Sequence, residues 1–159
     1  IHDLDLAAWL LDEPIVQVFA SASCLVDEDI GRLGDVDTAR TMLRTASGRL
    51  CVISNTRRSG YGYDQRIEAF GSAGMVCAGN RSRDTVQIAT ESGLTATPIM
   101  PGFLQRYVGA YRAEMDHFAD VAHGRAAPSV GYEAGLTALI LAEACDRSVQ
   151  TGRPVNLLQ

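Results

Sequence analysis

Hydrophobic and polar residues alternate over much of the first two-thirds of the chain, with the period of β-strands. Residues 37–44 alternate in this way. A turn at Ala46-Ser47-Gly48 then leads to an apolar segment at 50–54, which predicts a hairpin. The apolar run at 15–26 predicts a longer strand with both faces at least partly covered, followed by a loop marked by Gly31 and Gly34. Further strands are expected at 63–70, 75–78 and 85–89, and then a loop through Pro98 and Pro101.

The two ends of the chain have the helical period instead. Residues 2–11 place their apolar side chains on one face and end before Pro14, which disfavours helical geometry in the residue before it. An apolar stripe along residues 103–122 predicts one helix, and residues 132–149 predict another, which Gly152 followed by Pro154 ends. Residues 134–145 are apolar nearly all round, so we expect this second helix to be covered on most sides. Hairpins followed by helices predict an α+β domain with a large, mainly antiparallel open sheet and helices packed on one face. We expect no domain boundary within the chain.

Composition narrows the class of protein. The chain has 159 residues and a net charge of −5, which suits one globular domain and argues against a nucleic-acid partner. No apolar run approaches the roughly 18–20 residues that cross a bilayer, so we expect no membrane partner. The four cysteines are widely spaced without a C-x-x-C pair, which favours reduced thiols and a cytoplasmic location.

The open face of the predicted sheet carries few charged side chains. The charges expected there are Arg40, Arg44, Arg66 and Glu68. Such a sheet face is either covered or exposed to water, and the scarcity of charges favours a cover. We therefore expect a homo-oligomer, a dimer or a tetramer, that associates through this face.

Two groups of residues are candidates for chemistry. His2 lies beside Asp3 and Asp5, and an imidazole titrates near neutrality and is the commonest general base; a surface histidine at a helix start is the other interpretation. Tyr61, Tyr63 and the adjoining segment Asp64-Gln65-Arg66 offer hydroxyl, carboxamide and charged groups that suit a hydroxyl-rich ligand, although a tyrosine that caps the core explains them equally well. No dinucleotide-binding G-x-G-x-x-G is present.

Several motifs resemble one oxidoreductase family. Three segments carry the likeness: the run Ile1-His2-Asp3-Leu4-Asp5-Leu6 with Trp9-Leu10, the segment from Ser54-Asn55 through Tyr61-Gly62-Tyr63-Asp64-Gln65-Arg66, and the closing Thr151-Gly152-Arg153-Pro154-Val155. They are similar to the glucose–fructose oxidoreductase/inositol dehydrogenase/MocA-like family, and the Tyr-Gly-Tyr-Asp-Gln-Arg piece to its inositol 2-dehydrogenase branch. The resemblance covers nearly the whole chain.

The resemblance implies that residues 1–159 are the C-terminal substrate-binding and oligomerisation domain, and that an N-terminal Rossmann domain, absent from this chain, binds most of the NAD. It implies that His2 is the catalytic base and that Tyr61, with Tyr63 and Asp64 as further candidates, contacts myo-inositol or a related polyol. The family's catalytic lysine has no counterpart, because the chain contains no lysine. We therefore expect the isolated chain to be inactive. The alternatives are a non-catalytic oligomerisation or sugar-binding module, and an independent acid–base enzyme that pairs His2 with Asp3 or Asp5.

Overall fold

The computed structural model describes residues 1–157, and the chain divides into two compact units. Ile1–Arg58 and the residues from Ser129 onward form the first unit, and Ser59–Pro128 form the second. This division differs from the expectation of a chain without an internal boundary. Its physical reason is that the middle segment makes most of its contacts within itself, as the short hairpins described below show.

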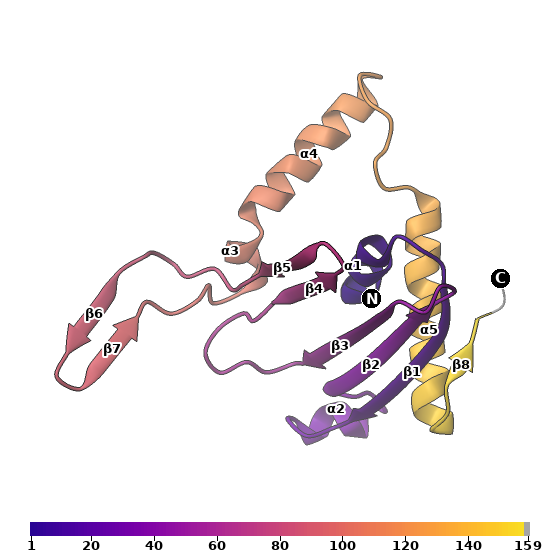
Figure 1. Ribbon diagram of the computed structural model, residues 1–159, viewed down its shortest axis with the longest axis horizontal. Helices are drawn as coiled ribbons and strands as arrows, with labels where there is room; N and C mark the ends of the chain where they lie inside the picture. The colour runs from indigo at the N-terminus through magenta and orange to yellow at the C-terminus, as the bar shows by residue number, and fades with distance from the viewer. Residues whose placement is uncertain (158–159) are drawn as a thin grey trace. The chain divides into compact units, whose positions relative to one another are not determined.

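A four-stranded antiparallel sheet forms the centre of the first unit, in the order β3-β2-β1-β8 (Figure 1). The strands are β1 (Ile15–Ser23), β2 (Thr38–Thr45), β3 (Leu50–Thr56) and β8 (Val155–Asn156). The predicted hairpin is confirmed as β2 and β3, with Leu43 opposite Cys51. The short edge strand β8 was not predicted, because two residues are too few to show a period.

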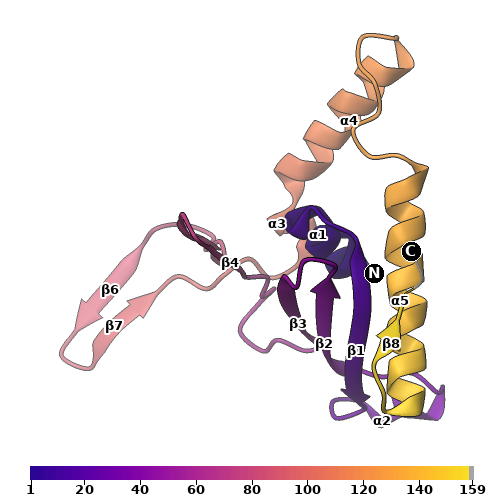
Figure 2. The same ribbon diagram turned by 45° about the vertical axis from the view of Figure 1, so that its right-hand side comes forward.

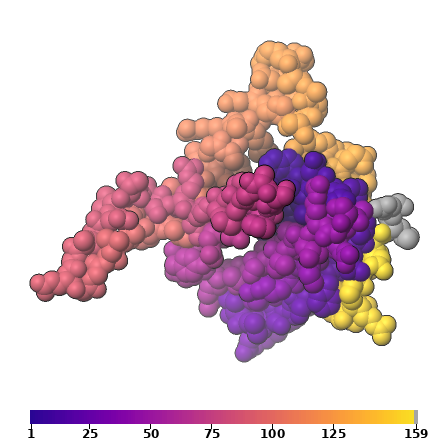
Figure 3. All heavy atoms as spheres, in the orientation of Figure 1, coloured from indigo at the N-terminus to yellow at the C-terminus, as the bar shows by residue number. Residues whose placement is uncertain are grey.

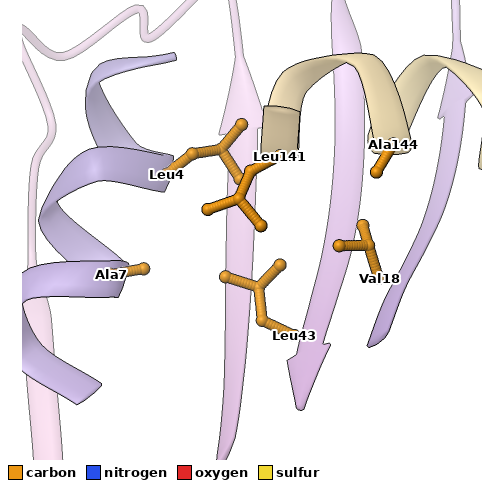
Figure 4. Close-up of a cluster of buried hydrophobic side chains, with 6 residues drawn as sticks. All are labelled: Leu4, Ala7, Val18, Leu43, Leu141 and Ala144. Carbon is orange, nitrogen blue, oxygen red and sulfur yellow. The ribbon is translucent and has the colours of Figure 1, made fainter. Parts of the chain in front are cut away.

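One face of this sheet holds the core. Val18 and Leu43 are fully buried, and with residues of two helices they form the hydrophobic cluster of Figure 4. The helices are α1 (His2–Leu11) and α5 (Tyr132–Thr151), and α5 runs along the sheet in both ribbon views (Figure 2). Both were predicted. However, α5 buries only one stripe, and Leu139 and Ile140 are more than two-fifths exposed, so the expectation that it is covered on most sides is wrong.

Ser148 joins α5 to the sheet through a fully buried hydroxyl. Its oxygen accepts a hydrogen bond of 2.9 Å from the amide of Ala20 in β1 and donates one of 2.7 Å to the carbonyl of Arg153. Four residues after Ser148, the helix ends at Gly152, whose φ of 64° is left-handed, a conformation that glycine adopts without strain. The sequence signal of Gly152 followed by Pro154 predicted this end correctly.

Strand β1 is shorter than expected, and the connection that follows it contains a helix. The strand ends at Ser23 rather than Val26, because Asp37 draws the next residues into a turn: its carboxylate accepts backbone N–H bonds from Leu25, Val26 and Asp27 at 2.7–3.0 Å. The short helix α2 (Glu28–Arg32) follows, where the sequence predicted only a loop. The side chain of Asp27 caps it by accepting from the amide of Asp29.

The second unit consists of two separate hairpins and a helical segment. One hairpin pairs β4 (Ile67–Gly71) with β5 (Gly74–Ala78), and the other pairs β6 (Gln87–Thr90) with β7 (Gly93–Ala96). Every residue of β6 and β7 is exposed, and Figure 3 shows this hairpin as a thin arm. Among the described residues, each of these four strands pairs only with its own hairpin partner.

Three predictions for this unit need correction. The strand expected at 63–70 begins only at Ile67, because side chains hold the residues before it in a loop, as the next subsection shows. The chain after residue 90 forms β7, where a loop was expected. The helix expected over 103–122 is interrupted at Tyr107, which separates α3 (Phe103–Arg106) from α4 (Val108–Ala122). No residue of α4 is buried, so its apolar stripe finds no cover within the described chain.

The second face of the four-stranded sheet carries no helix of the first unit. Its side chains lie in cross-strand rows, and the central row joins Phe19, Met42 and Val52, which are directly opposite one another. Met42 and Val52 are exposed. Arg40 and Arg44 flank Met42 on the same strand face. An antiparallel sheet with helices on one face confirms the α+β class. Among the described residues, no helix is long and apolar enough to span a membrane.

Candidate active site

His2 is the first residue of α1 and is exposed. Among residues 1–157 its imidazole makes no hydrogen bond or ion pair, so neither Asp3 nor Asp5 orients it. Asp3 instead accepts a 2.8 Å hydrogen bond from the side-chain amide of Asn55, which ties the start of α1 to β3. The interpretation of an independent acid–base pair at this helix start therefore finds no support in the geometry. An accessible, unpaired imidazole remains free to take a proton from a ligand.

The two candidate tyrosines stand on either side of Gly62, and this glycine decides the path of the loop. Its φ is +129°, and a Cβ built on it would lie 2.4 Å from Cγ1 of Ile99. Only glycine allows this close approach. The next amide, of Tyr63, donates a 2.8 Å hydrogen bond to the carbonyl of Met100. The loop is thus held against residues 99–100, with Tyr61 and Tyr63 in different surroundings.

Tyr63 is half-buried among aromatic rings. Its ring centroid lies 5.8 Å from that of Tyr107, edge to face, and 6.4 Å from that of Phe103. This environment agrees with the interpretation of a tyrosine that completes a small core. Tyr61, by contrast, is 63% exposed. Of the two, Tyr61 is the one whose hydroxyl a ligand can reach without moving a packed ring.

Asp64 is the centre of a polar cluster. Its carboxylate accepts two hydrogen bonds from the guanidinium of Arg66, at 2.8 and 2.9 Å, and one of 2.7 Å from the amide of Asn80. The hydroxyl of Tyr61 donates a further bond to the same carboxylate. The hydrogen bonds from Arg66, Tyr61 and Asn80, in this order of importance, hold the pKa of Asp64 well below its usual range. The side chain of Asp64 is only 15% exposed.

Residues that sequence reasoning did not select complete this arrangement. Asn80 also accepts the amide of Gln65 at 2.8 Å, and Tyr107 donates to the side-chain oxygen of Gln65. Arg106 donates to the carbonyl of Gly79 at 3.3 Å. Asn80 and Arg106 follow no recognisable motif in the sequence. Only their position in space, between the end of β5 and the start of the helical segment, connects them to the tyrosine loop.

Two buried polar atoms in the second unit have no partner. They are the hydroxyl oxygen of Ser59 and one guanidinium nitrogen, Nη1, of Arg106, and among the described residues they are the buried side-chain nitrogen and oxygen atoms without a hydrogen bond. Buried polar groups are normally satisfied, so such atoms mark places where a polar ligand or water completes the bonding.

The structure brings some predicted site residues together and treats others separately. Tyr61 and Asp64 are in direct contact, and Tyr63 lies in the same loop but packs on aromatic rings. All three belong to the second unit, whereas His2 belongs to the first.

The described residues fit neither a metal site nor a dinucleotide site. No group of three or more His, Cys, Asp or Glu side chains among them is arranged to hold a metal ion. The named strands of residues 1–157 pair antiparallel, and the loop with Gly60 and Gly62 leads to a hairpin strand, not to a helix N-terminus that would hold a pyrophosphate. NAD therefore has no cradle in this part of the chain.

The antiparallel sheet backed by α1 and α5 places this chain among the α+β domains. Residues 1–157 match the family described as "Oxidoreductase family, C-terminal alpha/beta domain". The chain belongs to this family, and the resemblance inferred from its motifs is confirmed.

Individual relatives agree. The chain is 44% identical over 157 residues to myo-inositol 2-dehydrogenase of Thermotoga maritima, covering 99% of this chain and 47% of that protein. It is 32% identical over 157 residues to scyllo-inositol 2-dehydrogenase (NAD(+)) of Bacillus subtilis, covering 99% and 46%. The crystal structure of a myo-inositol dehydrogenase from Corynebacterium glutamicum superposes with a TM-score of 0.92 at 41% identity, covering 99% and 47%. The chain thus spans about half the length of the relatives it matches.

Proposed function

We propose that this domain is the substrate-binding half of an NAD-dependent oxidoreductase that oxidises a ring hydroxyl of myo-inositol, or of a related polyol, to a ketone. The observation that carries the proposal is the match, along nearly the whole chain, to relatives that are named inositol 2-dehydrogenases. The exposed hydroxyl of Tyr61 and the polar cluster around Asp64 support it, because a polyol presents a hydroxyl at almost every edge.

NAD would be bound mainly by a further domain outside these residues, since the described chain offers no dinucleotide cradle. When bound, the nicotinamide supplies the hydride acceptor. This chain's own contribution is binding, orientation and proton transfer. We accordingly expect the 159 residues alone to turn over no myo-inositol with NAD. Measurable turnover by the isolated chain would contradict that division of roles.

His2 is the proposed general base, which removes the proton from the hydroxyl that is oxidised. The imidazole is exposed and makes no hydrogen bond or ion pair among the described residues, so a ligand can reach it. An alkoxide that formed without a nearby base would be costly. Tyr61 would contact another hydroxyl of the ring, with Tyr63 and Asp64 as further members of the substrate side.

The test is His2→Ala in the full-length protein, with His123→Ala as the matched control. His123 lies at the end of α4, where its ring is 2.6 Å from the carbonyl of Ala119. Loss of a general base lowers kcat by about 10²–10⁴-fold. We expect this loss for His2→Ala alone, with the affinity for NAD nearly unchanged. An equal fall in NAD affinity, or a kcat like that of the control, would rule out His2 as the base.

The open sheet face supports a second element of the proposal, association of copies of this chain. The row of Phe19, Met42 and Val52 is apolar, and Met42 and Val52 are exposed. A two-fold contact places the same patch on both sides, and an apolar row is complementary to itself. We propose a dimer or tetramer formed through this face. If the catalytic test fails, the same contact would be the basis of the alternative function, a non-catalytic oligomerisation module.

The four cysteines are free thiols, which fits a reducing compartment. We propose that the protein is located in the cytoplasm.

A further inference from the structure

The geometry around Tyr61 points to a restriction on the ligand that rests on the proposed function. We infer that Asp64 is a positioning residue: it captures the only hydroxyl proton of Tyr61, so the phenol oxygen faces the substrate as a hydrogen-bond acceptor. The site therefore selects a ring hydroxyl that donates, and discriminates against a group at that ring position that can only accept.

The first step is the count of donors and acceptors. A phenol has one O–H donor, and an ionised carboxylate only accepts. The Tyr61 hydroxyl must therefore be the donor in its bond to Asp64. The guanidinium of Arg66 also interacts with the side chain of Tyr61 and, since it can only donate, occupies one lone pair of the phenol oxygen. Tyr61 is 63% exposed. What remains for a ligand is a lone pair on the phenol oxygen.

The second step is what keeps Asp64 ionised and immobile. The fork of Arg66 binds both of its carboxylate oxygens, at 2.8 and 2.9 Å, and the amide of Asn80 adds a bond of 2.7 Å. Asn80 is itself tied to the backbone amide of Gln65 at 2.8 Å. The carboxylate accepts four bonds from neighbouring side chains, and it is mostly shielded from solvent. Asp64 thus acts on the ligand through Tyr61.

The substitution Asp64→Asn reverses the polarity of Tyr61. One carboxylate oxygen, Oδ1, takes donors from both Arg66 and Asn80, so the oxygen of an asparagine belongs there. Its NH₂ group then stands where Oδ2 faced both Tyr61 and Nη2 of Arg66, and it can only donate, so this guanidinium nitrogen loses its partner there. The phenol oxygen would have to accept from it, and its O–H would turn outward. The same ring in the same place would then offer a donor to the ligand.

The experiment uses myo-inositol and analogues in which a single hydroxyl is replaced by fluorine, which cannot donate a hydrogen bond. In the full-length wild-type protein we expect fluorine at one ring position to lower kcat/KM by roughly tenfold or more. This penalty should vanish in Tyr61→Phe, shrink in Asp64→Asn, and show no additional change when the two substitutions are combined. The matched control is Asp84→Asn.

Asp84 is a suitable control because its carboxylate also accepts several hydrogen bonds, at another place in the second unit. It accepts bonds of 2.8 Å from the amide of Val86 and 2.6 Å from the hydroxyl of Thr97, and it does not touch the tyrosine loop. Asp84→Asn should keep the full fluorine penalty. A penalty that is equal in wild type and Asp64→Asn, or one that Asp64→Asn lowers even when Tyr61 is already Phe, would overturn the inference.

A spectroscopic measurement separates this inference from the proposed function. The intensity ratio of the tyrosine Fermi doublet in the Raman spectrum falls when a phenol donates a hydrogen bond and rises when it accepts. The difference spectrum between wild type and Tyr61→Phe should show a donor, and the same difference in the Asp64→Asn background should show an acceptor. That result without turnover of any polyol would refute the proposed function alone. An acceptor signature in wild type would refute the positioning role, whatever the activity.

Discussion

The replacement Ser148→Ala tests how this sheet compensates for its short edge strand. In β1, the carbonyl of Val16 accepts from Leu157, so even-numbered residues of β1 direct their backbone groups toward β8. β8 pairs only with Gln17 and Val18 and then ends. The amide of Ala20 therefore lies beyond the edge strand, in a buried position, and the hydroxyl of Ser148 takes the place of the missing strand partner at 2.9 Å.

The cost of the substitution follows from these contacts. Alanine removes one oxygen and leaves the rest of α5 unchanged. The amide of Ala20 becomes an unsatisfied buried donor, which costs about 1–3 kcal/mol, and loss of the bond to the Arg153 carbonyl adds about 0.5–1.5 kcal/mol. We expect Ser148→Ala to lower the free energy of unfolding by about 2–4 kcal/mol.

The assay is urea denaturation followed by far-UV circular dichroism, together with hydrogen exchange of the Ala20 amide. Ser21→Ala is the control, because Ser21 is exposed on β1 and lies on its other face. We expect faster exchange at Ala20 and lower stability in Ser148→Ala only. A loss below about 0.5 kcal/mol, the usual range of surface substitutions, would show that water satisfies the amide and that this reasoning is wrong.

Two further predictions concern acid stability and association. Burial by itself raises the pKa of Asp37, but its backbone hydrogen bonds outweigh that effect and hold the pKa well below its ordinary value. The folded carboxylate thus binds its proton less tightly than the unfolded one. In urea titrations, the stability lost in Asp37→Asn should be largest near pH 6 and should shrink as the pH falls below about 4. The exposed Asp35→Asn is the surface control. For association, Met42→Arg should lower the mass of the protein measured by sedimentation equilibrium. Val76→Arg is the control and should leave the mass unchanged, because Val76 is exposed on β5. An unchanged mass in Met42→Arg would exclude the open sheet face as the interface.

Some features of the candidate site could be predicted from the sequence, and others could not; the same is true of the fold. The motif around Tyr61 was visible, and so was the family to which it belongs. The partners of Asp64 were not all visible: Arg66 is two residues away, but Asn80 is sixteen residues away on the far side of a hairpin. Without Asn80 and the contact to Tyr61, Asp64 looks like one more ligand-facing carboxylate.

Sequence by itself determined the elements whose signal is local. The alternation of 37–44, the end of the first helix before Pro14 and the end of the last helix at Gly152 all follow from side chains and backbone preferences within a few residues. These preferences act wherever the rest of the chain goes.

Only the tertiary structure decided the features that depend on distant partners. The amide of Ala20 and the hydroxyl of Ser148 are 128 residues apart, and Asp37 shapes a turn that begins a dozen residues before it. Edge strand β8 exists because its two residues meet β1, and the second unit separates because its hairpins find no larger sheet within the described chain. Such pairings are selected by the burial and hydrogen bonding of the whole domain, which no local window of sequence contains.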